Sequence, residues 1–345
     1  MSDGTRALRD DPRIDPRLVA AVEPFGLADT LPPSTLDASA PLEVIRSVLA
    51  KLEAGSVHMM ALATAGLEPV EGVSRETVKI CGPAGDLTLY VHRPVHVTGA
   101  VPGVLHLHGG GGVMMAAADD NYVRWRDELA ALGLVAVGVE FRNGAGRLGP
   151  HPFPAGLDDC AAALAWVDGR RESLGIDRVV VSGDSGGANL ALATAMRAGR
   201  EGVADRIAGV YALCPYISGA YAAPPPELPS LRDNDGILVS VTLMGAMAKA
   251  YTPDPAYVCD PLAWPSHASD EDLVGLPPHV ISVNELDPLR DEGLAHFRRL
   301  LAAGVPARSR TVNGTFHAAE NNYFAVIPDI ARSTLADLAT FARSL

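Results

Sequence analysis

Positive charge and long apolar runs are both scarce in this sequence. In 345 residues, 28 Lys and Arg stand against 41 Asp and Glu, which gives a formal charge of −13. Without a basic face to neutralise phosphates, nucleic acid and anionic membrane surfaces are poor partners. No stretch reaches the roughly 20 apolar residues that span a bilayer, and the charged start MSDGTRALRDDPR has no apolar signal core. We therefore expect a cytoplasmic protein with no membrane span that binds a neutral or weakly polar small molecule.

Clustered metal ligands are also lacking. The four cysteines do not have the C-x-x-C spacing of zinc sites and dithiol redox pairs, and we expect them to be reduced and mostly buried. They are Cys81, Cys160, Cys214 and Cys259. His106 and His108 form an H-x-H pair, but no third ligand follows nearby, so a metal site is the weaker interpretation.

Strand and helix patterns alternate through most of the chain. Residues 74–80 and 86–94 alternate in polarity around the turn GPAGD, which predicts an antiparallel hairpin. Short valine-rich runs then alternate with helical patterns, which indicates an α/β fold with a mostly parallel sheet covered by helices on both faces. The expected strands are 103–108, 134–140, 178–183, 209–215, 279–285 and 308–314, and the expected helices are 123–132, 156–168, 188–198, around 294–301, and 327–343.

Two segments lack strand signals. The first, residues 1–72, offers helical patterns at 17–22 and 41–55. The second, residues 216–257, carries a proline cluster and the methionine-rich helical run VTLMGAMAKAY. We expect both to form a helical cap, although ordinary core packing is the alternative for the methionines. The catalytic domain then consists of residues 73–215 and 258–345.

The pentapeptide Gly-Asp-Ser-Gly-Gly at 183–187 lies between an expected strand and an expected helix. It matches G-x-S-x-G, in which a sharp strand-to-helix turn exposes the serine hydroxyl. The outer glycines leave room for strand and helix to approach each other at that turn. Ser185 is therefore the candidate nucleophile, and an incidental glycine-rich turn is the alternative.

An earlier expected strand ends in His108 and is followed by four glycines, 109–112. Each glycine loses more backbone entropy on ordering than other residues do, so a purely structural turn has little reason to use four. Their backbone N–H groups can point at a developing oxyanion. We expect an oxyanion hole here, with a flexible loop as the alternative.

A serine hydroxyl needs a base to remove its proton and a partner to orient that base. Asp287 and His317 each follow an expected strand, so both lie at the carboxyl edge of the sheet. Asp291 is the rival acid, but it opens a helix, where Asp is favoured for capping. The order Ser, Asp, His is that of α/β hydrolases, whereas trypsin-like proteases, which share G-D-S-G-G, have the serine last.

Together these segments resemble the hormone-sensitive-lipase family of bacterial carboxylesterases. LHLHGGGG, SGDSGGANLALA, LPPHVISVNELDPLRDEG and GTFH stand in that family's order within residues 101–319. The glycines after the serine and the segment VEFRN resemble most the brefeldin A esterase branch. Two residues depart from the family pattern: Gly186 replaces the usual Ala, and Ala318 replaces the more frequent Gly.

The resemblance implies an α/β-hydrolase fold with a helical cap and a catalytic triad of Ser185, His317 and Asp287. The oxyanion hole then comprises the backbone N–H groups of Gly110, Gly111 and Gly186. The implied activity is that of a serine carboxylesterase which hydrolyses short to medium acyl esters through an acyl-enzyme, without a metal or an organic cofactor. A lactonase or amidase on the same triad stays open, as does a non-catalytic small-molecule receptor. The sequence also leaves open whether the chain forms a homodimer.

Overall fold

A mostly parallel sheet of eight strands organises the computed structural model, which describes residues 7–29 and 34–345. The strand order is β1-β2-β4-β3-β5-β6-β7-β8. β2 pairs antiparallel with both of its neighbours, and all later pairs are parallel. The strands are β1 (Val73–Gly82), β2 (Gly85–Pro94), β3 (Val101–Leu107), β4 (Val135–Val139), β5 (Ile176–Asp184), β6 (Gly209–Leu213), β7 (His279–Asn284) and β8 (Ala307–Val312).

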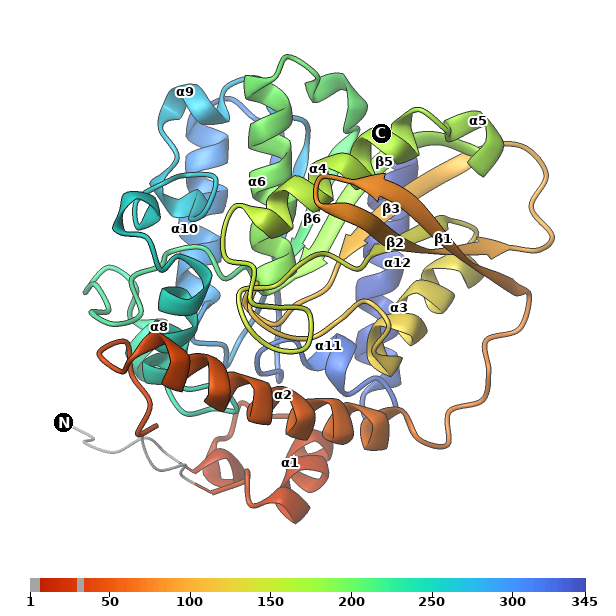
Figure 1. Cartoon of the computed structure of the whole chain (residues 1–345). Helices are drawn as coiled ribbons and strands as arrows, with labels where there is room; N and C mark the ends of the chain where they lie inside the picture. The colour runs from red at the N-terminus through yellow and green to blue at the C-terminus, as the bar shows by residue number, and fades with distance from the viewer. Residues whose placement is uncertain (1–6, 30–33) are drawn as a thin grey trace.

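Helices cover both faces of this sheet (Figure 1). In β5, Val179 and Val181 pack with the layer of α4, α6 and α10, whereas Val180 packs with the layer of α3 and α12. Because both faces are buried, the central strands are nearly continuous apolar runs. The flanking helices are α3 (Asp120–Ala131), α4 (Ala155–Asp168), α6 (Gly186–Arg200), α10 (Arg290–Ala302) and α12 (Pro328–Ser344). The expected sheet flanked by helices is confirmed.

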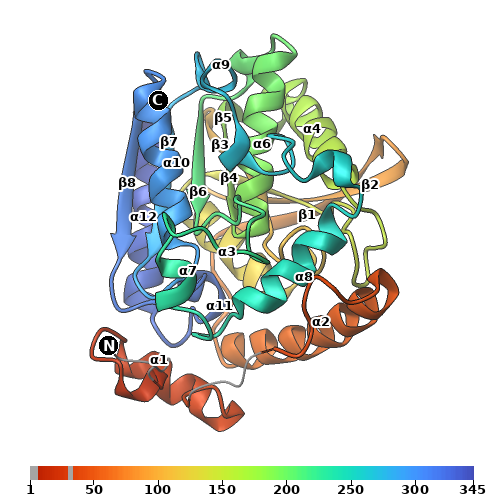
Figure 2. The same cartoon turned by 90° about the vertical axis from the view of Figure 1, so that its left-hand side faces the viewer.

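Three further helices gather at one end of the molecule in both views (Figures 1 and 2). They are α1 (Pro16–Val22), α2 (Leu42–Thr64) and α8 (Val241–Tyr251). α2 packs on α8 and on α3. Shorter elements are α5 (Arg171–Leu174), α7 (Ser230–Asp233), α9 (Asp270–Leu273), α11 (Ala319–Asn322) and the 3₁₀ helices η1 (Leu8–Asp10), η2 (Glu23–Phe25), η3 (Ala204–Arg206), η4 (Pro255–Tyr257) and η5 (Pro265–His267).

α1 attaches to the loops that follow β7 and β8. Its side chain Leu18 is fully buried in a cluster that contains Leu286 from the first loop and Phe316 from the second. The N–H of Asp15, the residue that caps the helix, donates to the carbonyl of Gly314 at 2.9 Å. The first helix therefore packs directly against the loops expected to carry the acid and the base.

Two expectations are corrected by the structure. α2 does not end at residue 55 but continues to Thr64, because Gly55 lies on an exposed helix face where a glycine is tolerated at a cost of about 1 kcal/mol. Of the four free cysteines, Cys160 and Cys214 are buried, but Cys81 and Cys259 are exposed. Among the described residues, no helix is both long and apolar enough to cross a membrane.

Two glycine substitutions that should change the stability in opposite directions test this packing. In β4, a Cβ at Gly138 would lie 2.7 Å from Nη1 of the buried Arg126, which is held by a hydrogen bond from its Nε to His92. We expect Gly138→Ala to destabilise the fold by about 1–3 kcal/mol through overpacking. Gly55→Ala meets nothing within 4 Å and should stabilise it by about 0.5–1 kcal/mol. Denaturant unfolding measures both, and midpoints that shift in the same direction would contradict the packing.

Candidate active site

Ser185 occupies a strained turn between β5 and α6. Its φ of 53° and ψ of −119° lie in a region that residues with a side chain rarely adopt. A Cβ at Gly183 would lie 2.4 Å from the backbone of Gly187, and a Cβ at Gly187 would lie 2.1 Å from the carbonyl of Leu107. Both positions therefore require glycine. The Ser185 N–H donates to the carbonyl of Leu213 at 2.9 Å, which fixes the turn against β6.

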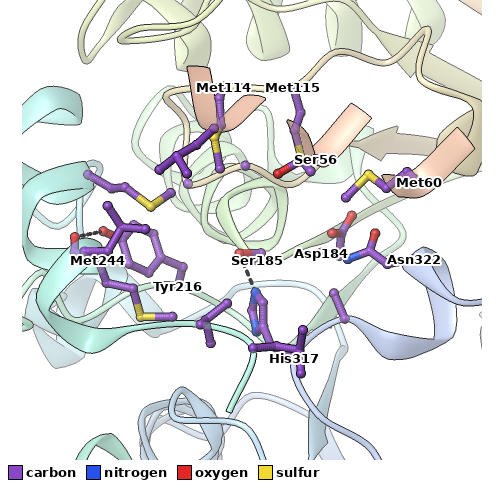
Figure 3. Close-up of a pocket in the computed structure, with 18 of the residues that line it drawn as sticks. Ser56, Met60, Met114, Met115, Asp184, Ser185, Tyr216, Met244, His317 and Asn322 are labelled. Atoms are coloured by element: carbon purple, nitrogen blue, oxygen red, sulfur yellow. Dashed lines mark hydrogen bonds between the residues drawn. The ribbon is translucent and has the colours of Figure 1, made fainter. Parts of the chain in front are cut away.

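His317 joins Ser185 to Asp287. Its Nε2 lies 2.9 Å from Ser185 Oγ, the contact drawn as a dashed line in Figure 3, and its Nδ1 lies 2.8 Å from Asp287 Oδ2. Asp287 is fully buried, and its Oδ1 accepts the N–H of Leu289 at 2.8 Å. The carboxylate therefore holds the proton on Nδ1 and leaves Nε2 free to accept one from the serine. The structure brings the three expected residues into one hydrogen-bonded chain.

Burial and a neighbouring charge shift the pKa of His317 in opposite directions. Burial favours the neutral imidazole, but the Asp287 carboxylate and its hydrogen bond outweigh it and raise the pKa of His317 well above the usual value. Cys214 also offers its sulfur within 4.8 Å of ligand atoms of Asp287 and His317. Burial raises the pKa of this thiol to about 11, so it is neutral at physiological pH. A metal would have to displace the thiol proton and the Asp287–His317 hydrogen bond, so the arrangement of Asp287 and His317 fits a triad with Ser185 better than a metal site.

The glycine loop after β3 contacts the nucleophile turn. Gly110 and Gly111 line the same cavity as Ser185 and have φ of 92° and 65°, which glycine adopts at no steric cost. Within residues 7–29 and 34–345, neither of their N–H groups has a hydrogen-bond acceptor. A Cβ at Gly186 would lie 2.6 Å from the backbone nitrogens of Gly111 and Gly112. The loop and the first turn of α6, whose N–H groups also lack helical partners, thus approach too closely for an alanine.

A buried tyrosine ties this loop to the turn. The Tyr122 hydroxyl accepts the N–H of Gly109 at 2.8 Å and lies 3.2 Å from Asp184 Oδ2, to which it donates. Asp184 directly precedes Ser185, and burial raises the pKa of its carboxyl to about 7. No sequence pattern points to Tyr122, because the contact joins α3 to the end of β5 across the fold.

A carboxylate from α2 supports the same loop. Glu53 is 4% exposed and accepts the N–H of Met115 at 2.7 Å and that of Arg147 at 2.8 Å. Met115 has a φ of 71°, which is unusual for a residue with a side chain. Sequence reasoning missed Glu53, although a signal was present: it follows the buried Ile45 and Leu49 at four-residue spacing, which places a charge on the apolar face of a helix.

The rival site residues have other contacts. Asp291 accepts the N–H of Ser230 at 2.8 Å and so fastens α7 to α10. His108 stacks on the ring of Phe141 at 3.9 Å between centroids. Burial lowers the pKa of both His106 and His108 to about 3, so these imidazoles are neutral. None of the three is part of the Ser185–His317–Asp287 chain.

The fold and this arrangement define the class of the protein. A serine on a strand–turn–helix junction, hydrogen-bonded to a histidine and an acid that follow later strands of a mostly parallel sheet, is typical of α/β hydrolases. Residues 104–321 match the family described as alpha/beta hydrolase fold. The chain belongs to this family.

Similarity to individual proteins extends over nearly the whole chain. Carboxylesterase NlhH of Mycobacterium tuberculosis is 31% identical over 340 residues, which cover 97% of each protein. A solved brefeldin A esterase, described as a bacterial homologue of human hormone-sensitive lipase, superposes with a TM-score of 0.93 at 42% identity and covers 99% of this chain and 96% of its own. Esterase Est22 superposes with a TM-score of 0.86 at 36% identity, covering 98% and 99%. The resemblance to the hormone-sensitive-lipase family and its brefeldin A esterase branch is confirmed.

The close contact at Gly186 generates a prediction about turnover. In Gly186→Ala the new Cβ displaces the Gly111 backbone, and we expect kcat on esters to fall about 100-fold, in the range for loss of one oxyanion donor. Gly199→Ala, further along the same helix, is the control, because its Cβ would meet only Leu276 at 3.5 Å. Steady-state kinetics together with thermal unfolding separate the two effects. Wild-type turnover in Gly186→Ala would show that the contact has no catalytic consequence.

Proposed function

We propose that this carboxylic ester hydrolase cleaves small esters with short to medium acyl chains through an acyl-enzyme on Ser185. One observation carries the proposal: the hydrogen-bonded chain from Ser185 through His317 to Asp287 opens onto a cavity of about 260 Å³. The relatives named as esterases, which span nearly the whole chain, support the same chemistry.

In the acylation step, Ser185 Oγ attacks the ester carbonyl carbon while His317 Nε2 accepts the hydroxyl proton. The negative charge that develops on the carbonyl oxygen is stabilised by the N–H groups of Gly110, Gly111 and Gly186. His317 then donates its proton to the departing alcohol as the C–O bond breaks. Asp287 stabilises the imidazolium in between without accepting the proton itself.

In the deacylation step, a water molecule takes the place of the alcohol. His317 Nε2 accepts a proton from this water as its oxygen attacks the acyl carbon. The second tetrahedral intermediate uses the same N–H groups. As its bond to Ser185 Oγ breaks, His317 donates the proton to Oγ, which releases the carboxylic acid and restores the serine hydroxyl. The chain's own residues therefore supply every proton transfer of the cycle.

We also infer that residues 1–72 and 216–257 form a cap over the catalytic domain of 73–215 and 258–345. Side chains of α2 and α8 border the cavity, and the two helices pack on each other. Carboxylates fasten both segments to the catalytic part: the buried Glu53 on the first segment, and the partly buried Asp291 opposite the second. The cytoplasmic location and a homodimer stay predictions.

Turnover on a p-nitrophenyl ester series from acetate to laurate tests the proposed function. We expect activity on short to medium esters, with a fall of about a millionfold in kcat for Ser185→Ala, because residues that act as a unit lose nearly all their effect together. His317→Ala should fall to a similar extent. An organophosphonate should inactivate the wild type with one equivalent per chain and leave Ser185→Ala unmodified.

Matched substrates decide between the remaining activities on the same triad. An amide and a lactone of the same acyl group, measured beside the ester, rank amidase, lactonase and esterase by kcat/KM. Ester turnover that persists in Ser185→Ala would exclude the acyl-enzyme. Binding of esters without turnover in the wild type would instead identify a small-molecule receptor.

The raised pKa of His317 predicts the acid side of the pH profile. Only the neutral imidazole accepts the serine proton, so kcat/KM should fall as the pH drops through a pKa above 6.5. Asp287→Asn removes the charge that raises this pKa while burial remains. The acid limb of the Asp287→Asn pH profile should therefore move to lower pH, and the plateau value of kcat/KM should fall about 10⁴-fold. An acid limb that stays in place would mean that another group controls it.

A further inference from the structure

Six of the eight methionines in the sequence line the cavity above Ser185. They come from three separate parts of the chain: α2, the glycine loop and α8. They are Met59, Met60, Met114, Met115, Met244 and Met247. The lining comprises 23 of the 345 residues, so an even scatter would place fewer than one methionine there. The fold therefore collects this residue type at the site.

These side chains form a wall that can change shape. Methionine is unbranched, has three rotatable side-chain bonds and carries a polarisable sulfur that packs well against aromatic rings. Two of the sulfurs contact tyrosine hydroxyls: Met115 Sδ lies 3.8 Å from that of Tyr122, and Met59 Sδ accepts that of Tyr323 at 3.9 Å. Met114 and Met247 are only half-buried, so their thioether ends have room to move.

Met247 has a particular position in this wall. Its terminal methyl lies 2.5 Å from where a Cβ on Gly111 would be, so it rests directly on the backbone of the oxyanion loop. A bulky ester bound against Gly111 would contact this methyl. A flexible methionine can swing aside at that position, whereas a branched side chain of similar volume has fewer conformations.

The cavity extends to both sides of the serine. Figure 3 shows Met244 and Tyr216 on one side of Ser185, and Met60, Asp184 and Asn322 on the other, with Met114 and Met115 opposite His317. The Tyr216 hydroxyl donates to the carbonyl of Met244 at 2.6 Å, which satisfies the polar end of the ring and leaves its apolar part to the cavity. The acyl half and the alcohol half of a bound ester would therefore each contact methionine side chains.

Among the described residues that line the cavity there is no Lys or Arg. Asp184 is its acidic side chain, and His317 is already paired with Asp287. Nearby cations are directed elsewhere: Lys249 Nζ donates to the carbonyls of Ala38 and Ala40. A substrate carboxylate that enters this cavity would lose its hydration without gaining a counter-ion, so its binding is strongly unfavourable.

We propose that this methionine wall selects uncharged esters that carry a bulky aromatic group, with Met244 and Met247 as specificity-determining residues. The inference rests on the proposed function, because it concerns the substrate of the same site. Aromatic rings gain sulfur contacts on the wall, and the mobile thioether ends adapt to their shape.

A pair of substrates matched in acyl length tests the exclusion of charge. p-Nitrophenyl hexanoate and mono-p-nitrophenyl adipate have the same number of acyl carbons and the same leaving group, and differ by a terminal carboxylate. We expect kcat/KM for the adipate to be at least 100-fold lower at neutral pH. Equal values for the two would overturn the inference that the cavity rejects anions.

Substitutions that conserve volume test the methionines. We compare p-nitrophenyl phenylacetate and 2-naphthyl acetate, each as a kcat/KM ratio to p-nitrophenyl acetate, in the wild type and in Met244→Leu/Met247→Leu. At least one ratio should fall about tenfold in the double variant. Met196→Leu, a methionine buried in α6 away from the cavity, is the matched control and should leave both ratios unchanged. The single variant Met247→Leu, at a half-buried position, repeats the test if the double variant unfolds.

The outcomes distinguish the role of the methionines from the proposed esterase function. Unchanged ratios with normal acetate turnover would overturn the role of the methionines and leave the esterase proposal standing. Absence of ester turnover in the wild type would instead overturn the proposed function. A ratio that falls equally in Met196→Leu would show a general effect of repacking and would also overturn the specificity role.

Discussion

The site depends on one backbone constraint, the left-handed conformation of Ser185 between β5 and α6. This conformation turns the chain sharply enough to present the hydroxyl at the edge of the sheet, and it requires strand, helix and glycine loop to meet at van der Waals distance. Glycines at 183, 186 and 187 make that approach feasible, and the hydrogen bond from the Ser185 N–H to Leu213 holds it. The expected oxyanion donors lie beside the nucleophile as a consequence of the same packing.

Much of this architecture follows from local sequence patterns. The strands were predictable because both sheet faces are buried, so each strand is a short apolar run between helices. Ser185, Asp287 and His317 were predictable as neighbours because parallel strands end at a common edge, and each of these residues follows such a strand. Gly186 was noted as a departure from the family pattern, and the structure supplies its reason, since the loop backbone occupies the space that an alanine side chain would need.

What the sequence did not provide are contacts between distant segments. Tyr122 and Glu53 support the glycine loop from α3 and from α2; helical spacing singles out Glu53 as a charge on an apolar face, but no local pattern predicts the partner of either residue. For the methionine-rich run that contains Met247, core packing stayed an alternative to a cap, because helical spacing does not distinguish the wall of a cavity from a filled core. The exposed Gly55 suggested a helix end where the helix continues, because a solvent-facing glycine costs too little to stop it.

The packing of α1 on the loops after β7 and β8 links the beginning of the chain to its end. Leu18 is buried against Leu286 and Phe316, residues that leave the ribosome long after it. During synthesis Leu18 therefore lacks these two partners until the loop after β8 has been made. α1 thus docks on the loops of Asp287 and His317 only after the intervening chain, which carries the glycine loop and the turn of Ser185, has been made.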